Sequence, residues 1–555
     1  MSKDTPPRSE TIKAAELPPT EAATSSEEKP SDEMAKGKLV REQAPRGVII
    51  FRVIALLLIT IFIFLCWSTV TNNGNGFIAY MFGVVASALF LVFLLSYVDW
   101  ENLDTEEKKP LGNQRHATPE DLKKHEVLSD SATDEAGVLP FPYVGLTEKN
   151  RCLLYKENCG LVTIGPPGSG KTTGLFIPNL SGLDRSILVI DPKGELASIT
   201  AERRREFGRV VVLDPFGKVA GGESAGFNPL ANLNPESPRF VPDAMALAEG
   251  LVRIRGHDPH WSEGGQDFVA ALIMFVRHKY GKAATLGHVR HLLTLPRKGK
   301  DGENNLLFTI AEMIESDFPP VRQKAGRFAT MTDEMGSIVS AAVSQTRFLD
   351  TPAIADDLAK DSGFDFAMMR RETVTVYLVL PLEEVGQHAN WLRLIVAAAL
   401  RALMKDTGDG SRPSVLFLLD EFAQLGHLSE IENAMAAVRG LNIQIWPILQ
   451  DLTQLKALYA DRWETFLGTA GMITTFGPND MTTAEYFSRR SGVTQVDIKH
   501  SGASNASTVP HSVPLFRPED LLGYPAGETL CFKRGLSHPI KAKVPLYKKL
   551  DWCKV

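Results

Sequence analysis

The chain has 555 residues, and 60 lysines and arginines against 66 aspartates and glutamates leave it a formal net charge of −6. This length is enough for two or three cores beyond any membrane part, and the charge argues against a surface coated with positive charge for nucleic acid, although not against a local basic groove. The five cysteines include no C-x-x-C pair, which argues against a zinc knuckle or a disulfide framework and favours a reducing compartment.

The N-terminal segment, residues 1–46, is rich in Pro, Ser, Thr, Glu and Lys and has almost no aromatic residues. A segment of this composition cannot bury enough apolar surface to order itself. It also lacks the cationic start and short apolar core of a signal peptide. We predict a disordered cytoplasmic tail.

Two uncharged apolar runs follow, Val53–Val70 and Phe77–Val98, and only residues 71–76 separate them. Each run is long enough to cross a membrane as a helix, so residues 47–99 are predicted to form a transmembrane hairpin. A buried core hairpin is the weaker interpretation, because two such runs stand back to back. Basic residues precede the first run and follow the second, whereas the loop carries no charge. The positive-inside rule therefore places both ends of the chain in the cytoplasm.

A charged, turn-rich stretch comes next, and we predict that residues 100–150 are a juxtamembrane linker. Soluble structure is expected to begin near Leu153. The remaining chain is expected to be a nucleotide-binding domain in two parts, residues 151–231 and 346–549, followed by a short C-terminal tail at 550–555.

A glycine-rich loop lies between the apolar run Leu161–Ile164 and Thr173–Ile177, which can open a helix. It fits the phosphate-loop pattern G-x-x-x-x-G-K-[ST], in which glycines allow a tight turn with backbone N–H groups pointing at phosphates. Lys171 would reach the β- and γ-phosphates of ATP, and Thr172 would hold Mg²⁺. A chance match is the weaker interpretation, given the strand and helix context. The predicted nucleotide-binding residues are Gly165, Pro166, Pro167, Gly168, Ser169, Gly170, Lys171, Thr172 and Thr173.

Apolar strands are predicted on both sides of a long helical stretch. Strands that are apolar throughout and alternate with helices indicate a parallel sheet covered on both faces. Residues 232–345 carry apolar residues at helical spacing and no convincing strand, which predicts an all-α domain inserted into the α/β domain. The predicted strands are Ser186–Ile190, Arg209–Leu213, Thr373–Leu380, Val415–Leu419, Ile443–Leu449, Met472–Phe476 and Glu528–Phe532.

Two carboxylates follow the apolar strand Val415–Leu419. In a phosphate-loop ATPase, Asp420 would hold Mg²⁺ through its water shell, and Glu421 would polarise the attacking water. An ordinary strand capped by acids is the alternative. Position downstream of a complete phosphate loop, in the same predicted sheet, favours the catalytic role.

Two further polar residues flank the next strand, Ile443–Leu449. Gln450 ends it, and because parallel strands direct their C-terminal ends to the ligand crevice, its amide could sense the γ-phosphate or simply make a strand-end hydrogen bond. Arg439 precedes it, at the far end from the phosphates of its own subunit. It could stabilise a neighbour's γ-phosphate in a ring, or it could be a surface arginine at a helix end.

Several motifs together resemble the type IV secretion coupling proteins of the TraG/TraD class, over roughly residues 47–549. They are Leu418–Gly426, Asp191–Glu195, Phe227–Leu230, Gln450-Asp451 with Gln454-Leu455, and Asn479-Asp480 with Thr483-Ala484 and Tyr486. The resemblance implies an α/β fold: a RecA-like P-loop NTPase domain with a parallel-rich sheet, an inserted all-α domain and an N-terminal two-helix transmembrane anchor.

The same resemblance implies a homo-hexamer in the bacterial inner membrane that hands substrate to a type IV secretion channel. By motif position, it also implies that Arg439 is the arginine finger and Gln450 the sensor. One departure is the loop between the spans, residues 71–76, because members of the class usually carry a longer periplasmic segment there.

Three functions are consistent with these features. The first is an ATPase that delivers effector proteins or relaxase–DNA to a secretion channel, with cargo contacting the all-α domain. The second is a membrane-anchored DNA pump of the FtsK/HerA kind, and the third is a membrane receptor with a mainly structural nucleotide site. Absence of strong basic character slightly favours protein cargo. Either of two basic clusters could meet DNA phosphates, although such runs usually form solvated or lipid-facing surfaces. One consists of Arg203, Arg204, Arg205 and Arg209, and the other of Lys533, Arg534, Lys541, Lys543, Lys548 and Lys549.

Overall fold

The computed structural model describes residues 112–220, 222–254, 259–296, 305–330, 332–406, 410–501 and 506–554, together with Met81, Gly83 and Val84. The disordered tail and nearly all of the two predicted membrane-spanning runs lie outside the described residues. No helix within those described ranges is long and apolar enough to cross a membrane. The chain divides into two compact units, Met1–Lys108 and Lys109–Val555, and nearly all described residues belong to the second.

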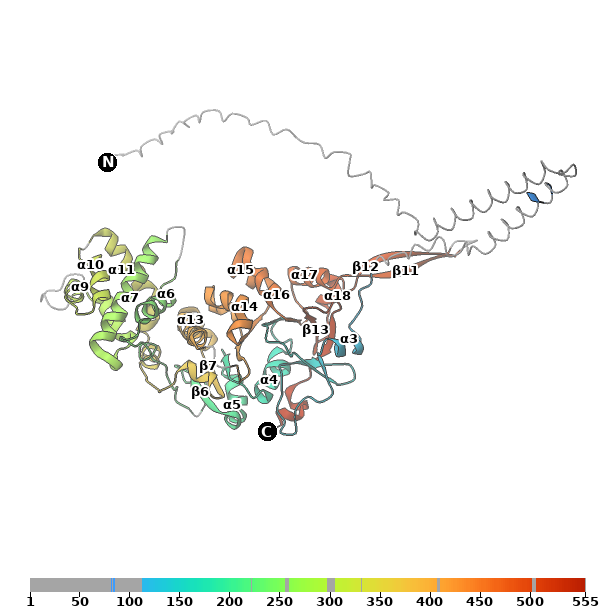
Figure 1. Ribbon diagram of the computed structural model, residues 1–555, viewed down its shortest axis with the longest axis horizontal. Coiled ribbons are helices and arrows are strands. Elements are labelled where there is room, and N and C mark those ends of the chain that lie inside the picture. The colour runs from blue at the N-terminus through green and yellow to red at the C-terminus, as the bar shows by residue number, and fades with distance from the viewer. Residues whose placement is uncertain are drawn as a thin grey trace, which may run out of the picture. The chain divides into compact units, whose positions relative to one another are not determined.

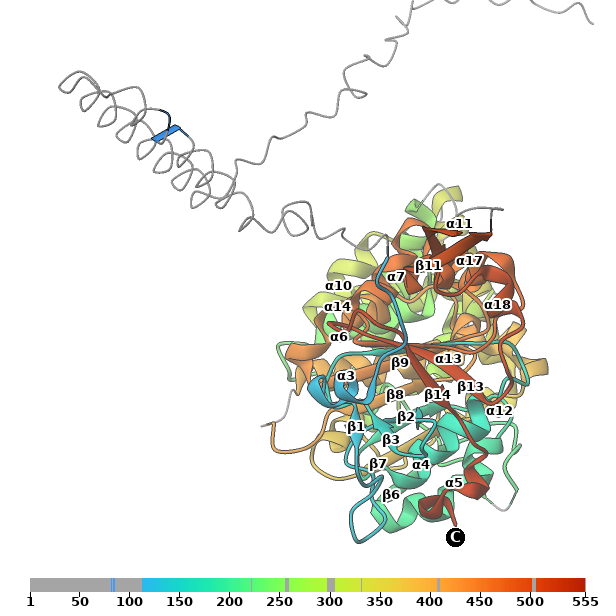
Figure 2. The same ribbon diagram turned by 90° about the vertical axis from the view of Figure 1, so that its right-hand side faces the viewer.

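A twelve-stranded sheet forms the centre of this second unit (Figures 1 and 2). Seven neighbouring strands are parallel, in the order β10-β4-β9-β8-β5-β7-β6, as the apolar runs predict. Every residue of β5, β8 and β9 is buried, because helices cover both faces. The bounds are β4 Leu161–Ile164, β5 Ile187–Ile190, β6 Arg209–Leu213, β7 Val374–Leu378, β8 Val415–Leu419, β9 Ile443–Leu449 and β10 Met472–Thr475.

The other part of the sheet is antiparallel and begins earlier in the chain than Leu153, so the expected start of soluble structure is wrong. A short helix, α3 (Pro119–Lys124), and two strands of the sheet lie within the predicted linker, residues 100–150. These strands are short, and a register shift near Gly145 interrupts one of them, so they leave no period-two pattern in the sequence. The antiparallel strands are β1 Leu128–Ser129, β2 Tyr143–Leu146, β3 Cys152–Leu154, β13 Glu528–Lys533 and β14 Ile540–Lys543.

The C-terminal residues also pack onto this part of the fold. Trp552 donates its indole N–H to the carbonyl oxygen of Pro178 at 3.1 Å, and its ring meets that of Tyr143 edge-on. Leu550 and Cys553 are buried. The described part of the predicted tail, residues 550–554, is therefore docked on the folded unit through Leu550, Trp552 and Cys553.

The described residues between β6 and β7 form helices and no strand. They gather at one end of the unit, away from the antiparallel strands (Figure 1). The longest is α7 (His260–Tyr280), whose middle is wholly buried from Phe268 to Arg277. The other long helices are α6 Phe240–Leu251, α8 Leu286–Thr294, α9 Leu306–Ile314, α10 Pro319–Gly326 and α11 Asp333–Gln345.

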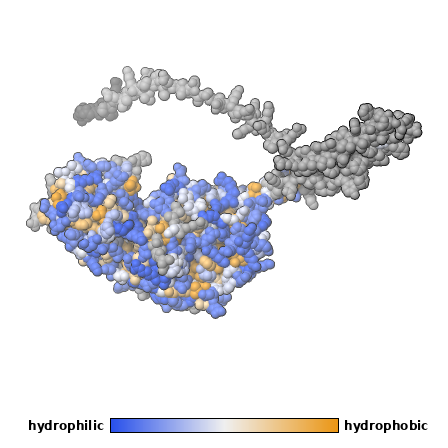
Figure 3. Space-filling model, in the orientation of Figure 1, coloured by the Kyte–Doolittle hydropathy of each residue, from blue (hydrophilic) through white to orange (hydrophobic). Residues whose placement is uncertain are grey.

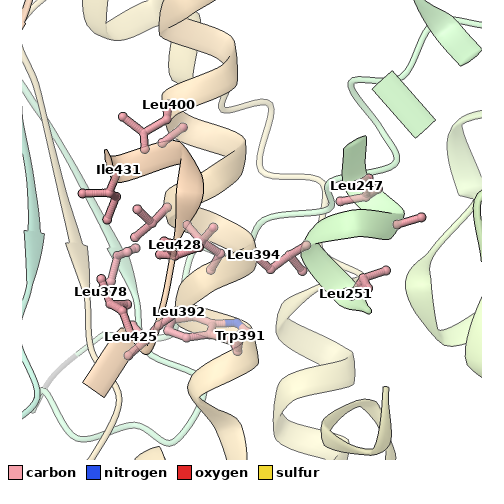
Figure 4. Close-up of a cluster of buried hydrophobic side chains, with 14 of the residues drawn as sticks. Leu247, Leu251, Leu378, Trp391, Leu392, Leu394, Leu400, Leu425, Leu428 and Ile431 are labelled. Carbon is pink, nitrogen blue, oxygen red and sulfur yellow. The ribbon is translucent and has the colours of Figure 1, made fainter. Parts of the chain in front are cut away.

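One long helix, α13 (Leu382–Lys405), connects these helices with the sheet. Figure 4 shows Leu394 of α13 pointing at Leu247 and Leu251 of α6, while the other side of α13 faces buried residues near the sheet. Those residues include Leu378 of β7 and Ile431 of α14 (Ser429–Leu441). All belong to one buried cluster, so the helical region and the sheet share a core. The surface over them is mostly hydrophilic in the view of Figure 3.

Candidate nucleotide site

The glycine-rich loop starts at the C-terminal end of β4, where the parallel strands open toward one edge of the sheet. Gly168 and Gly170 have φ of 78° and 94°, a region that L side chains rarely adopt. A Cβ at Gly165 would come within 2.8 Å of Phe476 Cβ, so that position also requires glycine. After the loop, the chain turns through one π-helical segment, Thr172–Phe176, into α4 (Ile177–Gly182). Such π segments occur frequently at functional sites.

The two predicted carboxylates follow β8, which lies two strands from β4 in the sheet. Glu421 adopts a left-handed conformation with φ 48° and ψ 43°, which is uncommon for a residue with a side chain and is typical of constrained functional positions. Its backbone N–H donates to Oδ1 of Asp420 at 3.0 Å. The turn therefore presents both carboxyl groups at the same edge as the glycine-rich loop.

These groups surround one cavity of about 320 Å³. Its lining contains the loop residues from Pro167 to Thr173, Asp420 and Glu421. The residues after β5 complete the wall: Asp191, Pro192, Lys193, Glu195 and Leu196. The structure thus brings together most of the residues that the sequence assigned to nucleotide and Mg²⁺.

Lys193 is a cavity residue that sequence reasoning missed, because Asp191–Glu195 served there only as a family motif. The available signal was its place after β5, a buried parallel strand whose C-terminal end shares the edge of β4 and β8. Asp191 also lines the cavity, but its side chain is only 2 % exposed and accepts a hydrogen bond from the backbone N–H of Ala197 at 2.8 Å. It fixes the start of α5 (Glu195–Phe207), which positions Lys193.

Burial and neighbouring charges shift the pKa values of two ionisable side chains in this site, Lys171 and Asp420. Lys171 donates through Nζ to the carbonyl oxygens of Gly165 and Pro166, at 2.8 Å for Pro166. Burial lowers the pKa of Lys171, although the nearby carboxylates of Asp420 and Glu421 act in the opposite direction. Burial, and then the Glu421 charge, raises the pKa of Asp420 to about 6. A divalent cation would relieve this repulsion.

Gln450 lies against the carboxylate of Glu421. Its Nε2 donates to Oε2 of Glu421 at 3.0 Å, and its backbone N–H donates to Oε1 of Gln454 at 3.0 Å. Arg439 is apart from this group: it lies on α14, before β9 begins, and therefore at the opposite edge of the sheet. The side chain of Arg439 lies outside the described residues.

The residues of the cavity fit a nucleoside triphosphate with Mg²⁺. Ser169 Oγ is buried and has no hydrogen-bond partner among the described residues, although buried polar groups are almost always bonded. A Cβ at Gly168 or Gly170 would meet nothing within 4 Å, so the space over the loop is open. Lys171 and Asp420 both line the cavity and would supply a cation for phosphates and a carboxylate for the metal.

Known proteins are similar to this chain in sequence and in fold. The family model described as "Type IV secretory system Conjugative DNA transfer" matches residues 125–554. The conjugal transfer protein TraG of Rhizobium radiobacter is 30% identical over 397 residues, which are 68% of this chain and 60% of that protein. Protein VirD4 of Agrobacterium fabrum is 28% identical over 382 residues, 65% of this chain and 54% of that protein. The chain thus spans about 60% of the length of the TraG relative.

Solved structures of the plasmid coupling protein TrwB have the same fold. The complex with the ATP analogue ADPNP superposes with a TM-score of 0.57 at 14% sequence identity and covers 79% of this chain and 95% of that one. At this identity the likeness concerns the fold alone. The family model, in contrast, matches well over half of the chain, and the chain therefore belongs to the family of type IV secretory system conjugative DNA-transfer proteins.

Proposed function

We propose that the protein is an inner-membrane ATPase that couples ATP hydrolysis to delivery of DNA, with its bound protein, into a type IV secretion channel. The observation that carries this proposal is the single cavity shared by the phosphate loop, Asp420 and Glu421. The family's description as conjugative DNA transfer favours DNA over the protein cargo that the weakly acidic composition favours. TrwB structures with ADPNP and with ADP and Mg²⁺ support nucleotide and Mg²⁺ as the ligands.

The roles of the residues follow from their places around the cavity. The loop's backbone N–H groups and the Lys171 ammonium bind the phosphates, and Lys171 exchanges its bonds to the loop carbonyls for phosphate oxygens. Thr172 and Asp420 would hold Mg²⁺, which neutralises charge on the β- and γ-phosphates. Glu421 accepts a proton from the attacking water. Gln450, which already holds Glu421, senses the γ-phosphate.

The active assembly is a homo-hexamer anchored by the two-span hairpin, with both chain ends in the cytoplasm. Arg439 supports this assembly, because it lies at the edge of the sheet opposite its own phosphate loop. An arginine there can reach the γ-phosphate only in another protomer, where a guanidinium stabilises the charge of the transition state. Hydrolysis at subunit boundaries then moves protomers around a central pore, and the helical region contacts cargo.

The test is Mg²⁺-dependent ATP hydrolysis by the full-length protein, together with conjugal transfer in cells. Replacing Lys171 by Ala removes the phosphate-binding ammonium and is expected to reduce hydrolysis by about 10²–10³-fold and abolish transfer. The matched control is Lys149→Ala, which removes an exposed lysine away from the cavity. Transfer that persists unchanged in Lys171→Ala contradicts the motor and favours a receptor with a structural nucleotide site. DNA pumping that needs no secretion channel favours the FtsK/HerA-like alternative.

A further inference from the structure

A two-stranded ribbon projects from the folded unit at the end opposite the long helices (Figure 1). Its strands, β11 (Val493–Ser501) and β12 (Ala506–Pro514), pair with each other in an antiparallel register and not with the twelve-stranded sheet. The ribbon follows α17 (Met481–Ser491), which itself follows β10, the neighbour of the phosphate-loop strand β4. The ribbon is therefore connected through α17 to the strand next to the phosphate-loop strand.

One face of the ribbon is apolar and exposed. Side chains alternate between the faces of a strand, and Ile498 pairs with Val509, so these two and Val496 share one face. Their exposed fractions are 42 %, 41 % and 45 %. The opposite face carries Gln495, Asp497 and Ser512. Neighbouring exposed β-branched residues on a projecting ribbon need a cover, since an uncovered apolar strand face promotes aggregation.

Asn113 and Gln114 pair with the base of this ribbon. Asn113 bridges Thr494 in antiparallel orientation, and the backbone N–H of Gln114 donates to the carbonyl oxygen of Val493 at 3.0 Å. Because this pairing is antiparallel, the direction from Gln114 back to Gly112 is the direction in which β11 runs from its base toward the ribbon's tip. Gly112, the first described residue of this stretch, therefore lies on the tip side of Gln114.

The predicted second span, Phe77–Val98, ends 14 residues before Gly112 (112 − 98). A chain of this length reaches at most about 50 Å even when fully extended, whereas the nine residues of β11 cover about 30 Å. The start of the unit cannot move freely from the ribbon, because Gln114 also meets His538 (Oε1 to Nδ1, 3.2 Å). A tether of this reach is therefore long enough for the tip of the ribbon to meet the membrane surface, if residues 77–98 span the membrane as predicted.

We propose that the apolar face formed by Val496, Ile498 and Val509 lies in the interfacial region of the lipid bilayer. The insertion is shallow, because a two-stranded ribbon has unpaired backbone groups at its edges that the hydrocarbon core would leave without partners. His511 is the one ionisable side chain on the described part of this face, so little charge opposes burial. This inference rests on the two-span anchor of the proposed function and gives the motor a second membrane contact.

The test uses the full chain reconstituted in liposomes in a Cys66→Ser background. The other native cysteines are buried, which protects them from labelling. Ile498→Cys and Val509→Cys receive an environment-sensitive fluorophore, and Ser512→Cys on the opposite face is the matched control. Quenching is measured with nitroxide-labelled lipids and, separately, with iodide in the buffer. ATP hydrolysis by the same samples reports on the motor independently.

Lipid quenching is expected to be several-fold stronger at residues 498 and 509 than at 512, with the opposite order for iodide. Equal iodide quenching at all three positions overturns the proposal, because the face is then open to water. Protection of 498 and 509 from both quenchers also overturns it, because protein then covers the face. A chain that fails to float with liposomes overturns the anchor and the ribbon contact together, while its hydrolysis rate still tests the ATPase.

Discussion

Charged residues lie at both edges of the parallel strands, but they line an open cavity at one edge and are buried in the fold at the other. At the C-terminal edge, Lys171, Asp420 and Glu421 line an open cavity. At the N-terminal edge, Arg185 and Arg204 are buried and hydrogen-bonded to groups of the fold. A buried charge that is hydrogen-bonded within the fold stabilises it, whereas a charge that lines an open cavity is available for a ligand.

Arg204 is the clearest example of a buried charge that is hydrogen-bonded within the fold. It is fully buried and donates to Oγ1 of Thr375 at 2.7 Å, to the carbonyl oxygen of Arg185 at 2.6 Å, and to that of Leu183. Arg370, near the same edge, likewise donates to main-chain carbonyl oxygens, including that of Leu403 at 3.1 Å. The basic cluster around Arg204 is therefore not one DNA-binding surface, and that interpretation is wrong for Arg204.

The largest effect is expected at the open edge. Glu421→Gln keeps the shape of the side chain but removes the base, so hydrolysis should fall by about 10²–10⁴-fold while nucleotide binding is retained. Turnover and the binding of a fluorescent ATP analogue are measured on the same samples. If nucleotide binding is lost together with turnover, Glu421 instead binds the nucleotide, and its role as the base is contradicted.

The role of the buried charges at the N-terminal edge of the parallel strands is tested by measuring the free energy of unfolding. Arg204→Met leaves several buried carbonyl groups without a donor, and we expect the free energy of unfolding to fall by roughly 2–4 kcal/mol. The matched control is Arg205→Met, whose side chain is 58% exposed and pairs with Glu202 one turn away, with an expected change within about 0.5 kcal/mol. Denaturant unfolding measures both. Equal, small changes in the two variants would show that the buried edge contributes little.

A smaller effect is expected for Gln450→Leu. The variant loses the hydrogen bond from Nε2 to Glu421, and one such bond corresponds to about a tenfold change in rate. The turnover should fall with little change in the affinity for nucleotide. A variant with wild-type turnover would reduce Gln450 to a strand-end residue.

The smallest effect concerns pH. The pKa of Asp420 is raised from 3.8 to about 6, chiefly by burial, so the folded protein binds a proton there more tightly than the unfolded chain does. The nucleotide-free protein should therefore lose stability as pH rises from about 4 to about 6. Asp420→Asn removes this contribution and should raise the melting temperature at pH 7.5. An identical pH dependence in variant and wild type would contradict the assignment.

The residues of the candidate nucleotide site were predictable because their signals are local. A glycine-rich loop and an acid-ended apolar strand, such as Val415–Leu419, show their roles within a few residues, and parallel strands bring their ends together. The burial of Arg204 was not predictable, because its acceptors lie on segments distant in sequence. The left-handed backbone of Glu421 has no glycine to mark it. The short strands before Leu153 have too few residues for a period.

Mixing two inactive variants tests the shared site most directly. In Lys171→Ala protomers the phosphate loop fails but Arg439 is intact, whereas Arg439→Ala protomers have the converse defect. If each site joins one protomer's loop to its neighbour's arginine, mixed assemblies contain some complete sites, and ATP hydrolysis should return when the two inactive proteins are combined. If hydrolysis stays absent in every mixture, or if Arg439→Ala alone hydrolyses ATP at the wild-type rate, the account of a site completed by the neighbouring protomer is contradicted.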